Sequence, residues 1–211
     1  MKPALITVGY CAPIIQYAII YQTEQLHIEA KGNFQKQSYR TRMKIATSTG
    51  ELTLIVPILH RKDKTERQQY YDVKIENKFH WQRDHWRSLK IAYQTSPYFE
   101  YYEDDFEHLY HTTYDSLIDF NNACHAVIIE CLQLEITPIL TEEFFKNPEQ
   151  LDYRDLVQAK KEPSYPLPEY HQLFNENHGY LSNLTILDLL FNLGPSAQDY
   201  LAKVDLSNEL A

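Results

Sequence analysis

The stretch ALITVG at residues 4–9, the apolar run from Ala12 to Tyr21 and the stretch QLHIE at residues 25–29 together decide the fold class of this chain. The first and last pieces are short apolar runs, which are typical of buried strands. Pro13 stands near the beginning of the run between them, where a helix accepts proline. Strand, helix and strand in this order predict two parallel strands joined by a helical crossover.

Outward from this unit, side-chain alternation predicts a β-hairpin formed by residues 42–47 and 51–58, which Ser48-Thr49-Gly50 would link. Residues 60–69 contain no apolar side chain and are expected to form a solvated loop. Val73 and Ile75 indicate one more short strand. Apolar periodicity and helix start signals predict helices over residues 81–93, from Ser96-Pro97 onward, over 114–134, near 149–159 and over 183–192, where Gly194 would end the last helix.

These elements predict a single compact α/β domain, in which helices cover a small mixed parallel and antiparallel sheet. Residues 1–78 are expected to be mainly strands and residues 79–135 helical. The acidic, proline-dotted segment 136–169 is expected to be an excursion over the surface, and residues 170–211 to form C-terminal helices.

Composition excludes several classes of protein. Five glycines in 211 residues leave no glycine-rich phosphate loop, and no run of about 18 apolar residues predicts a membrane span. Three cysteines suit neither a zinc cluster nor a disulfide framework, which favours a reducing, cytoplasmic location. The net charge of −9 argues against a nucleic-acid partner. Residues 1–100 carry 15 basic and 9 acidic side chains, whereas residues 101–211 carry 5 and 20, so a basic cleft in an acidic protein is expected.

A polar cluster that precedes the predicted hairpin contains Lys36, Arg40 and Arg42. Alternation along an incoming strand would direct both arginines to one face, where their guanidinium groups would bind a carboxylate or a phosphate in bidentate fashion. The same residues are also typical of a solvated edge strand protected by charge. The sequence leaves both interpretations open.

A second cluster places Trp81 and His85 four residues apart on one helical face. His85 is a candidate general base, because the pKa of a free histidine lies near 6.5, or a hydrogen-bonded histidine on an aromatic packing face. Asp188 and Asn192 form a polar stripe on the apolar helix 183–192, which must be hydrogen-bonded internally or used in a site. The acidic and histidine residues 104–115 have helical spacing, but a solvated helix explains them better than a metal site, so neither a metal ion nor another cofactor is predicted.

These segments, in this order, resemble the WbqC-like protein family of bacteria, in a form similar to its Bacteroides-type branch. The matching stretches are Tyr10 with Ala12-Pro13 and Tyr17, Lys36-Gln37 with Tyr39-Arg40 and Arg42, Leu52-Thr53 with Val56-Pro57, Trp81 with His85-Trp86, Tyr93 with Ser96–Tyr102, Asp119–Asn121, and His178–Leu181 with Asn183–Asn192 and Gly194-Pro195. The chain departs from the family pattern at Ile15-Gln16 and at Thr41.

The resemblance implies an enzyme of bacterial surface-polysaccharide or O-antigen biosynthesis that transfers an acyl or aminoacyl (glycyl) group to an amino sugar. Lys36, Arg40 and Arg42 would hold an anionic or sugar-linked ligand, His85 would deprotonate the acceptor amine, and Trp81 would stack on the sugar. His178, Asp188 and Asn192 would line the opposite wall. The motifs add Tyr10, Tyr17, Gln37, Tyr39 and Asn183 as candidate binding residues.

Two other functions fit the same residues. A protein that binds a sugar nucleotide or another small anion without chemistry would use the same basic and aromatic side chains. A structural partner in a polysaccharide system would instead use its basic face to dock another protein. The sequence does not identify the donor, the acceptor or the oligomeric state.

Overall fold

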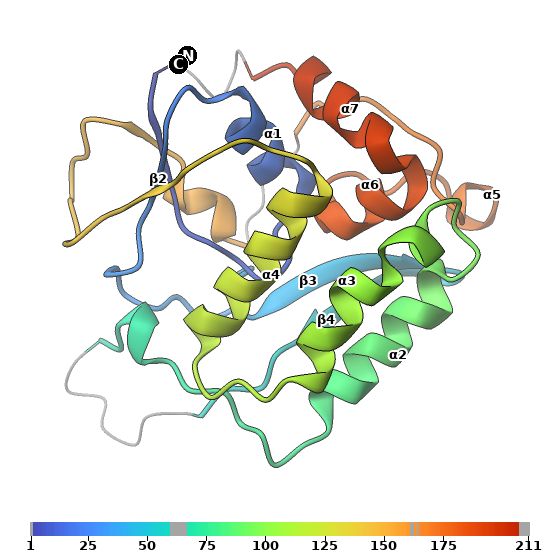
Figure 1. Cartoon of the computed structure of the whole chain (residues 1–211), viewed down its shortest axis with the longest axis horizontal. Helices are drawn as coiled ribbons and strands as arrows, with labels where there is room; N and C mark the ends of the chain where they lie inside the picture. The colour runs from blue at the N-terminus through green and yellow to red at the C-terminus, as the bar shows by residue number, and fades with distance from the viewer. Residues whose placement is uncertain (1, 60–66, 161–162, 164, 207–211) are drawn as a thin grey trace.

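Two parallel strands joined by a helix begin the fold, as the sequence predicts. β1 (Ala4–Ile6) runs parallel to β2 (Leu26–Ile28), and α1 (Ile14–Gln22) connects them (Figure 1). The computed structural model describes residues 2–59, 67–160, 163 and 165–206. Every residue of α1 from Ile14 to Ile20 is buried, which suits a helix that carries no charged side chain.

Two short strands from the middle of the chain widen this sheet on both sides. β5 (Ile139–Leu140) pairs with β2, and β6 (Leu151–Asp152) pairs with β1, so that the strand order is β5-β2-β1-β6 and all pairs are parallel. The segment 136–169, expected as a surface excursion, therefore supplies both edge strands of the sheet.

The prediction of a helix near 149–159 is wrong. The backbone N–H groups of Leu151 and Tyr153 donate to the carbonyls of Pro3 and Leu5, so this part of the chain is extended along β1. Only the stretch Arg154–Val157 is helical, as a single 3₁₀ turn. Pairing with β1 takes up the donors that an α-helix would need.

The predicted hairpin is present as a separate two-stranded sheet. β3 (Arg42–Thr47) and β4 (Gly50–Ile55) are antiparallel, and Arg42 lies opposite Ile55. The strand expected at Val73 and Ile75 is reduced to isolated bridges on either side of a 3₁₀ turn at Tyr70–Asp72. Of the expected solvated loop, residues 60–66 lie outside the described residues.

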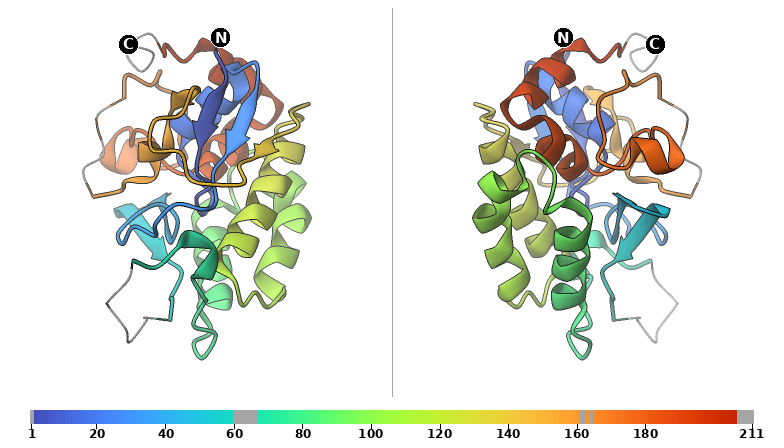
Figure 2. Two further views of the ribbon diagram at one scale, coloured as in Figure 1. Left: turned by 90° about the vertical axis from the view of Figure 1, so that its left-hand side faces the viewer. Right: turned by 90° about the vertical axis from the view of Figure 1, so that its right-hand side faces the viewer.

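Helices fill the rest of the domain. α2 (Trp81–Tyr93) has the predicted bounds, and α3 (Phe99–His111) and α4 (Leu117–Cys131) follow it. α5 (Asn175–His178), α6 (Ile186–Leu193) and α7 (Ala197–Lys203) complete the chain. α3 packs between α2 and α4, while α1 packs against α6 and α7. Figure 2 shows the hairpin beside the group of helices α2, α3 and α4, and Figure 1 shows it behind them.

The aromatic core joins these layers into the single compact α/β domain that the sequence predicts. The ring of Phe191 on α6 lies 5.3 Å from Tyr93, 5.0 Å from Phe99 and 5.8 Å from Phe106, measured between ring centroids. All four rings are buried. α6 is therefore the element around which α2 and α3 pack.

Gly194 ends α6 with a left-handed backbone conformation (φ +53°), as predicted from its position. A Cβ atom added there would lie 2.5 Å from the ring of Tyr98. We expect Gly194→Ala to lower the free energy of unfolding by about 2–4 kcal/mol, because backbone strain adds to steric overlap. Urea denaturation measures this loss. Gly50→Ala is the matched control: Gly50 also has positive φ, but nothing lies within 4 Å of its added Cβ. Equal losses in the two variants would contradict the contribution of steric overlap with the Tyr98 ring.

Candidate functional site

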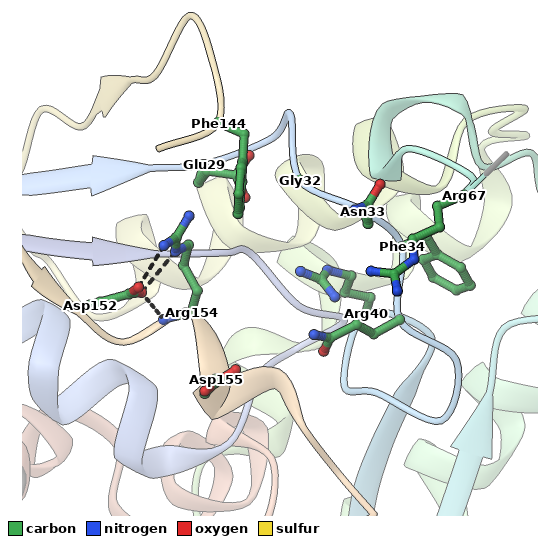
Figure 3. A pocket seen from close by; sticks show the side chains of 11 residues that line it. Glu29, Gly32, Asn33, Phe34, Arg40, Arg67, Phe144, Asp152, Arg154 and Asp155 are labelled. Carbon is green, nitrogen blue, oxygen red and sulfur yellow. Dashed lines mark hydrogen bonds and ion pairs between the residues drawn. The ribbon is translucent and has the colours of Figure 1, made fainter. Parts of the chain in front are cut away.

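A pocket of about 520 Å³ opens where the parallel strands end (Figure 3). Glu29 follows β2 directly, and Asp152 is the last residue of β6. In open parallel sheets, ligands bind outside the carboxyl ends of the strands, because several loops converge at that edge. The charged side chains that line the pocket are Glu29, Arg40, Arg67, Asp152, Arg154 and Asp155.

Arg40 is the most deeply buried basic residue of this pocket, with 4% of its surface exposed. One of its Nη atoms donates to Thr7 Oγ1 at 3.5 Å, and its guanidinium carbon lies 5.0 Å from the centroid of the Tyr70 ring. Burial lowers its pKa. Its Nε and Nη1 atoms have no acceptor among the described residues. A buried guanidinium with two unused donors is suited to an anionic ligand.

Arg154 reaches the pocket from the 3₁₀ turn after β6. Its Nε and Nη2 atoms donate to the two carboxylate oxygens of Asp152 at 2.8 and 2.5 Å, which lowers the pKa of Asp152 and raises that of Arg154. Within the described part of the chain, its Nη1 atom has no acceptor. The pairing thus fixes the orientation of the guanidinium and leaves one nitrogen available to a ligand.

Glu29 brings a carboxyl group into the pocket that these arginines line, and 2% of its surface is exposed. The backbone N–H groups of Lys31 and Gly32 hydrogen-bond it, and a Cβ atom on Gly32 would lie 2.5 Å from Oε2. A larger residue at position 32 would therefore displace the Glu29 carboxyl. Burial raises the pKa of Glu29, against the opposing effect of these backbone hydrogen bonds and of Arg154 and Arg40.

The predicted cluster of Lys36, Arg40 and Arg42 is divided between two pockets. Arg40 precedes β3 and enters the pocket at the sheet edge, whereas Lys36, Gln37 and Arg42 line a second pocket of about 270 Å³ against the end of β4. The expectation that both arginines share one face is wrong, because Arg40 lies in a turn and not in the strand. Phe34 lines both pockets, so they are neighbours.

Comparison with protein families supplies an independent observation. The sequence model of the WbqC-like protein family matches residues 9–165, about three quarters of the chain. The chain belongs to the WbqC-like protein family. Comparisons with curated proteins and with solved structures each gave no match. Every residue that lines the sheet-edge pocket lies within the range that the WbqC-like family matches, whereas the run His178–Pro195 lies beyond it.

In this WbqC-like protein, His85 lies in a buried aromatic network and not in a described pocket. Its Nδ1 atom and the hydroxyl of Tyr110 both lie 2.9 Å from the hydroxyl of Tyr10, and Trp81 meets the imidazole edge-on. Burial lowers the pKa of His85 to about 4, although a hydrogen bond with the backbone of Ile55 opposes the shift. The role of general base stays a prediction; the geometry favours a packed, neutral imidazole.

Three further candidates from the motifs of the WbqC-like family also hold the fold together. The Tyr17 hydroxyl is 3.2 Å from Nδ1 of His125. The carbonyl of Tyr39 accepts from the backbone N–H of Tyr10, and the N–H of Tyr39 donates to the carbonyl of Val157. Asn183 Oδ1 accepts from the backbone N–H of Ile15 at 3.0 Å, which satisfies a donor at the beginning of α1. Each of the three is buried.

The candidates from the C-terminal part lie apart from the sheet-edge pocket. Asp188 is fully buried on α6, where Tyr93 and Tyr170 donate to its carboxylate at 2.8 and 2.5 Å, and burial raises its pKa. Asn192 donates to the backbone carbonyl of Asp188 at 2.8 Å. The Nε2 atom of His178 lies 2.9 Å from the carbonyl oxygen of Thr47 on the hairpin. None of the three lines the described pockets.

Of the charged residues of the pocket, sequence reasoning found Arg40 and missed five, which are Glu29, Arg67, Asp152, Arg154 and Asp155. Glu29 was taken only as the last residue of a strand. The other four lie in segments expected to be a solvated loop or a surface excursion. The order strand, charged residue, glycine at Ile28–Gly32 was the available signal for Glu29, because it places a carboxyl at a parallel strand end.

Two other properties concern only the described residues. No group of three or more histidine, cysteine, aspartate or glutamate side chains there is arranged to hold a metal ion. No described helix combines the length and apolar character needed to cross a bilayer.

Proposed function

We propose that this WbqC-like protein is a cytoplasmic enzyme of bacterial surface-polysaccharide biosynthesis that transfers an acyl or aminoacyl group to an amino sugar. The sheet-edge pocket would hold the anionic part of the donor or of a nucleotide-linked sugar. The family membership supports the polysaccharide context through the resemblance described above. The transfer reaction itself is the proposed part.

The observation that carries the proposal is the set of unused guanidinium donors. Arg40 and Arg154 each present buried N–H groups without acceptors in the described part of the chain, and Arg67 lines the same pocket. A phosphate or carboxylate would satisfy these donors through charge-assisted hydrogen bonds. The pocket volume of about 520 Å³ suits a ligand of nucleotide size.

The second pocket supports a ligand with two parts. Lys36 and Arg42 lie there beside the apolar residues Ile55, Val56 and Pro57, and the shared wall at Phe34 connects it to the arginines of the first pocket. An anionic group in the first pocket and an attached sugar or acyl group toward the second would use both. Lys36, Gln37 and Arg42 would thus contact the part of the ligand in the second pocket.

Arg40→Gln is expected to weaken the binding of UDP-N-acetylglucosamine at least tenfold, because a charge-assisted hydrogen bond in a buried site contributes about 1.5–3 kcal/mol. Isothermal titration calorimetry measures the dissociation constant. Arg87→Gln is the control: Arg87 is an exposed arginine of α2 outside the described pockets. Equal affinities in wild type and Arg40→Gln would contradict the assignment of the pocket.

Mass spectrometry then tests whether chemistry follows binding. The protein is incubated with the nucleotide-linked amino sugar, glycine or acetate, and ATP or the corresponding thioester. A mass gain that equals the acyl group supports the transferase. Tight binding with no new product from any donor would favour the non-catalytic binding protein.

A further inference from the structure

The sheet-edge pocket contains an unused acceptor as well as unused donors. Oε1 of Glu29 is buried and, in the part of the chain that the structure describes, has no donor. Arg40 and Arg154, whose positive charges act to lower the pKa of Glu29, have unused N–H groups in the same pocket. Direct pairing of Glu29 with either arginine is absent among the described side chains, so a ligand that both accepts and donates hydrogen bonds fits between them.

We propose that Glu29 is the catalytic base of this pocket and accepts a proton from an amine or hydroxyl of the ligand whose anionic group is bound by Arg40 and Arg154. The proposal rests on the function proposed above and names the residue that carries its proton transfer. No motif of the resemblance included Glu29.

The N–H or O–H bond of the acceptor breaks, and its proton moves to Oε1 of Glu29. The electron pair left on nitrogen or oxygen forms the new bond to the carbonyl carbon of an activated acyl group. The bond between that carbon and its leaving group breaks, and the leaving group departs with the electron pair and then receives the proton from Glu29.

The surroundings of Glu29 suit this role better than those of the other pocket carboxylates. Asp152 is engaged by both Nε and Nη2 of Arg154, and Asp155 is exposed and accepts from Gln158. Backbone N–H groups fix one side of the Glu29 carboxyl, so Oε1 is held in place for its partner. Burial raises the pKa of Glu29 and makes it a stronger base than an exposed glutamate, although Arg40 and Arg154 oppose the shift.

The first test follows Glu29 in the free, full-length protein. Carboxyl ¹³C signals of labelled glutamate are followed by NMR as the pH changes, and Glu29→Gln identifies the signal that disappears. We expect its titration midpoint above the ordinary value for glutamate. A midpoint at or below that value would overturn the proposal. This measurement needs no ligand. Glu29→Gln has to fold only under the one condition used to assign the signal, because the titration itself follows the wild type.

The second test uses inorganic sulfate, an anion that does not itself titrate between pH 5 and 8. Sulfate beside Arg40 and Arg154 repels an ionised Glu29 and accepts a hydrogen bond from a protonated one, so we expect its affinity for the wild type to fall at least fivefold from pH 5 to pH 8. Glu29→Gln should bind sulfate at both pH values as tightly as the wild type does at pH 5. Glu135→Gln, which alters an exposed glutamate outside the described pockets, should keep the wild-type pH dependence.

The outcomes separate the two proposals. An unchanged pH dependence in Glu29→Gln overturns the role of Glu29 and leaves the anion pocket standing. Failure of sulfate and UDP-N-acetylglucosamine to bind the wild type at either pH overturns the proposed function, while the NMR midpoint still decides whether Glu29 has the properties of a base. Where mass spectrometry detects a product, Glu29→Gln should lower kcat about 10²–10⁴-fold with a much smaller change in KM.

Discussion

Replacing Asp188 by alanine is expected to lower the free energy of unfolding by about 2–4 kcal/mol. The carboxylate accepts from Tyr93 and Tyr170, and also lies within hydrogen-bond distance of Gln172 and Asn192. Truncation leaves these donors buried without an acceptor and opens a cavity beside the first turn of α6. Thermal and urea denaturation of the variant measure the loss.

Asp188→Asn is the matched control for this network. It keeps the shape and one acceptor oxygen, and it removes the cost of a buried charge, which is visible in the raised pKa of Asp188. We expect it to cost about half as much as alanine or less. If asparagine and alanine lowered the free energy of unfolding equally, the negative charge would be what stabilises the network. The filled volume and the remaining acceptor oxygen would then contribute little.

Acid is expected to destabilise this protein already at pH values above those at which most carboxylates titrate. Burial lowers the pKa of both His85 and His125 to about 4, whereas an unfolded histidine titrates near 6.5. Between these values the unfolded chain binds more protons than the folded one, so stability falls as the pH drops through this window. Each histidine is expected to remove roughly 3 kcal/mol by pH 4.

Urea denaturation at pH 7, 6, 5 and 4 measures this dependence. In His125→Gln and in His85→Gln, the free energy of unfolding should fall with pH by about half as much as in the wild type, because glutamine does not titrate. His80→Gln, which alters an exposed histidine before α2, should keep the full decline. A wild type that is as stable at pH 5 as at pH 7 would show that the two imidazoles gain a partner for the proton on folding.

The sequence predicts the large elements of this fold well, because each leaves a long side-chain pattern. α2 has the predicted bounds, since Trp81, Leu89 and Tyr93 face the core at helical spacing. The hairpin and the parallel pair β1 and β2 also follow from their alternation and apolar runs. Strands of only two residues, such as β5 and β6, have no such pattern, and backbone hydrogen bonds to a distant segment determine them.

The same limit explains which site residues the sequence finds. Arg40 stands in a conspicuous polar cluster and lines the sheet-edge pocket, and its role in binding a ligand stays a prediction. Arg154 reaches the pocket of Arg40 only through the pairing of β6 with β1, and Glu29 through the pairing of β2 with β1; no local pattern indicates that the three residues share a pocket. His85 and Trp81 attract attention as chemistry-bearing types, but aromatic packing also selects them, and composition does not separate these roles.

The late position of β6 in the chain affects how the protein folds during its own translation. Leu151 follows the end of β2 by 123 residues, so a ribosome that adds 5–20 residues per second needs about 6–25 s to supply this strand. Until β5 is supplied, the nascent chain carries β1 and β2 with both outer edges unpaired, and the edge of β1 stays unpaired until β6 follows; unpaired edges are targets for chaperones or for other strands. The nascent chain also lacks Arg154, so a ligand can assist folding only after translation has passed the edge strand.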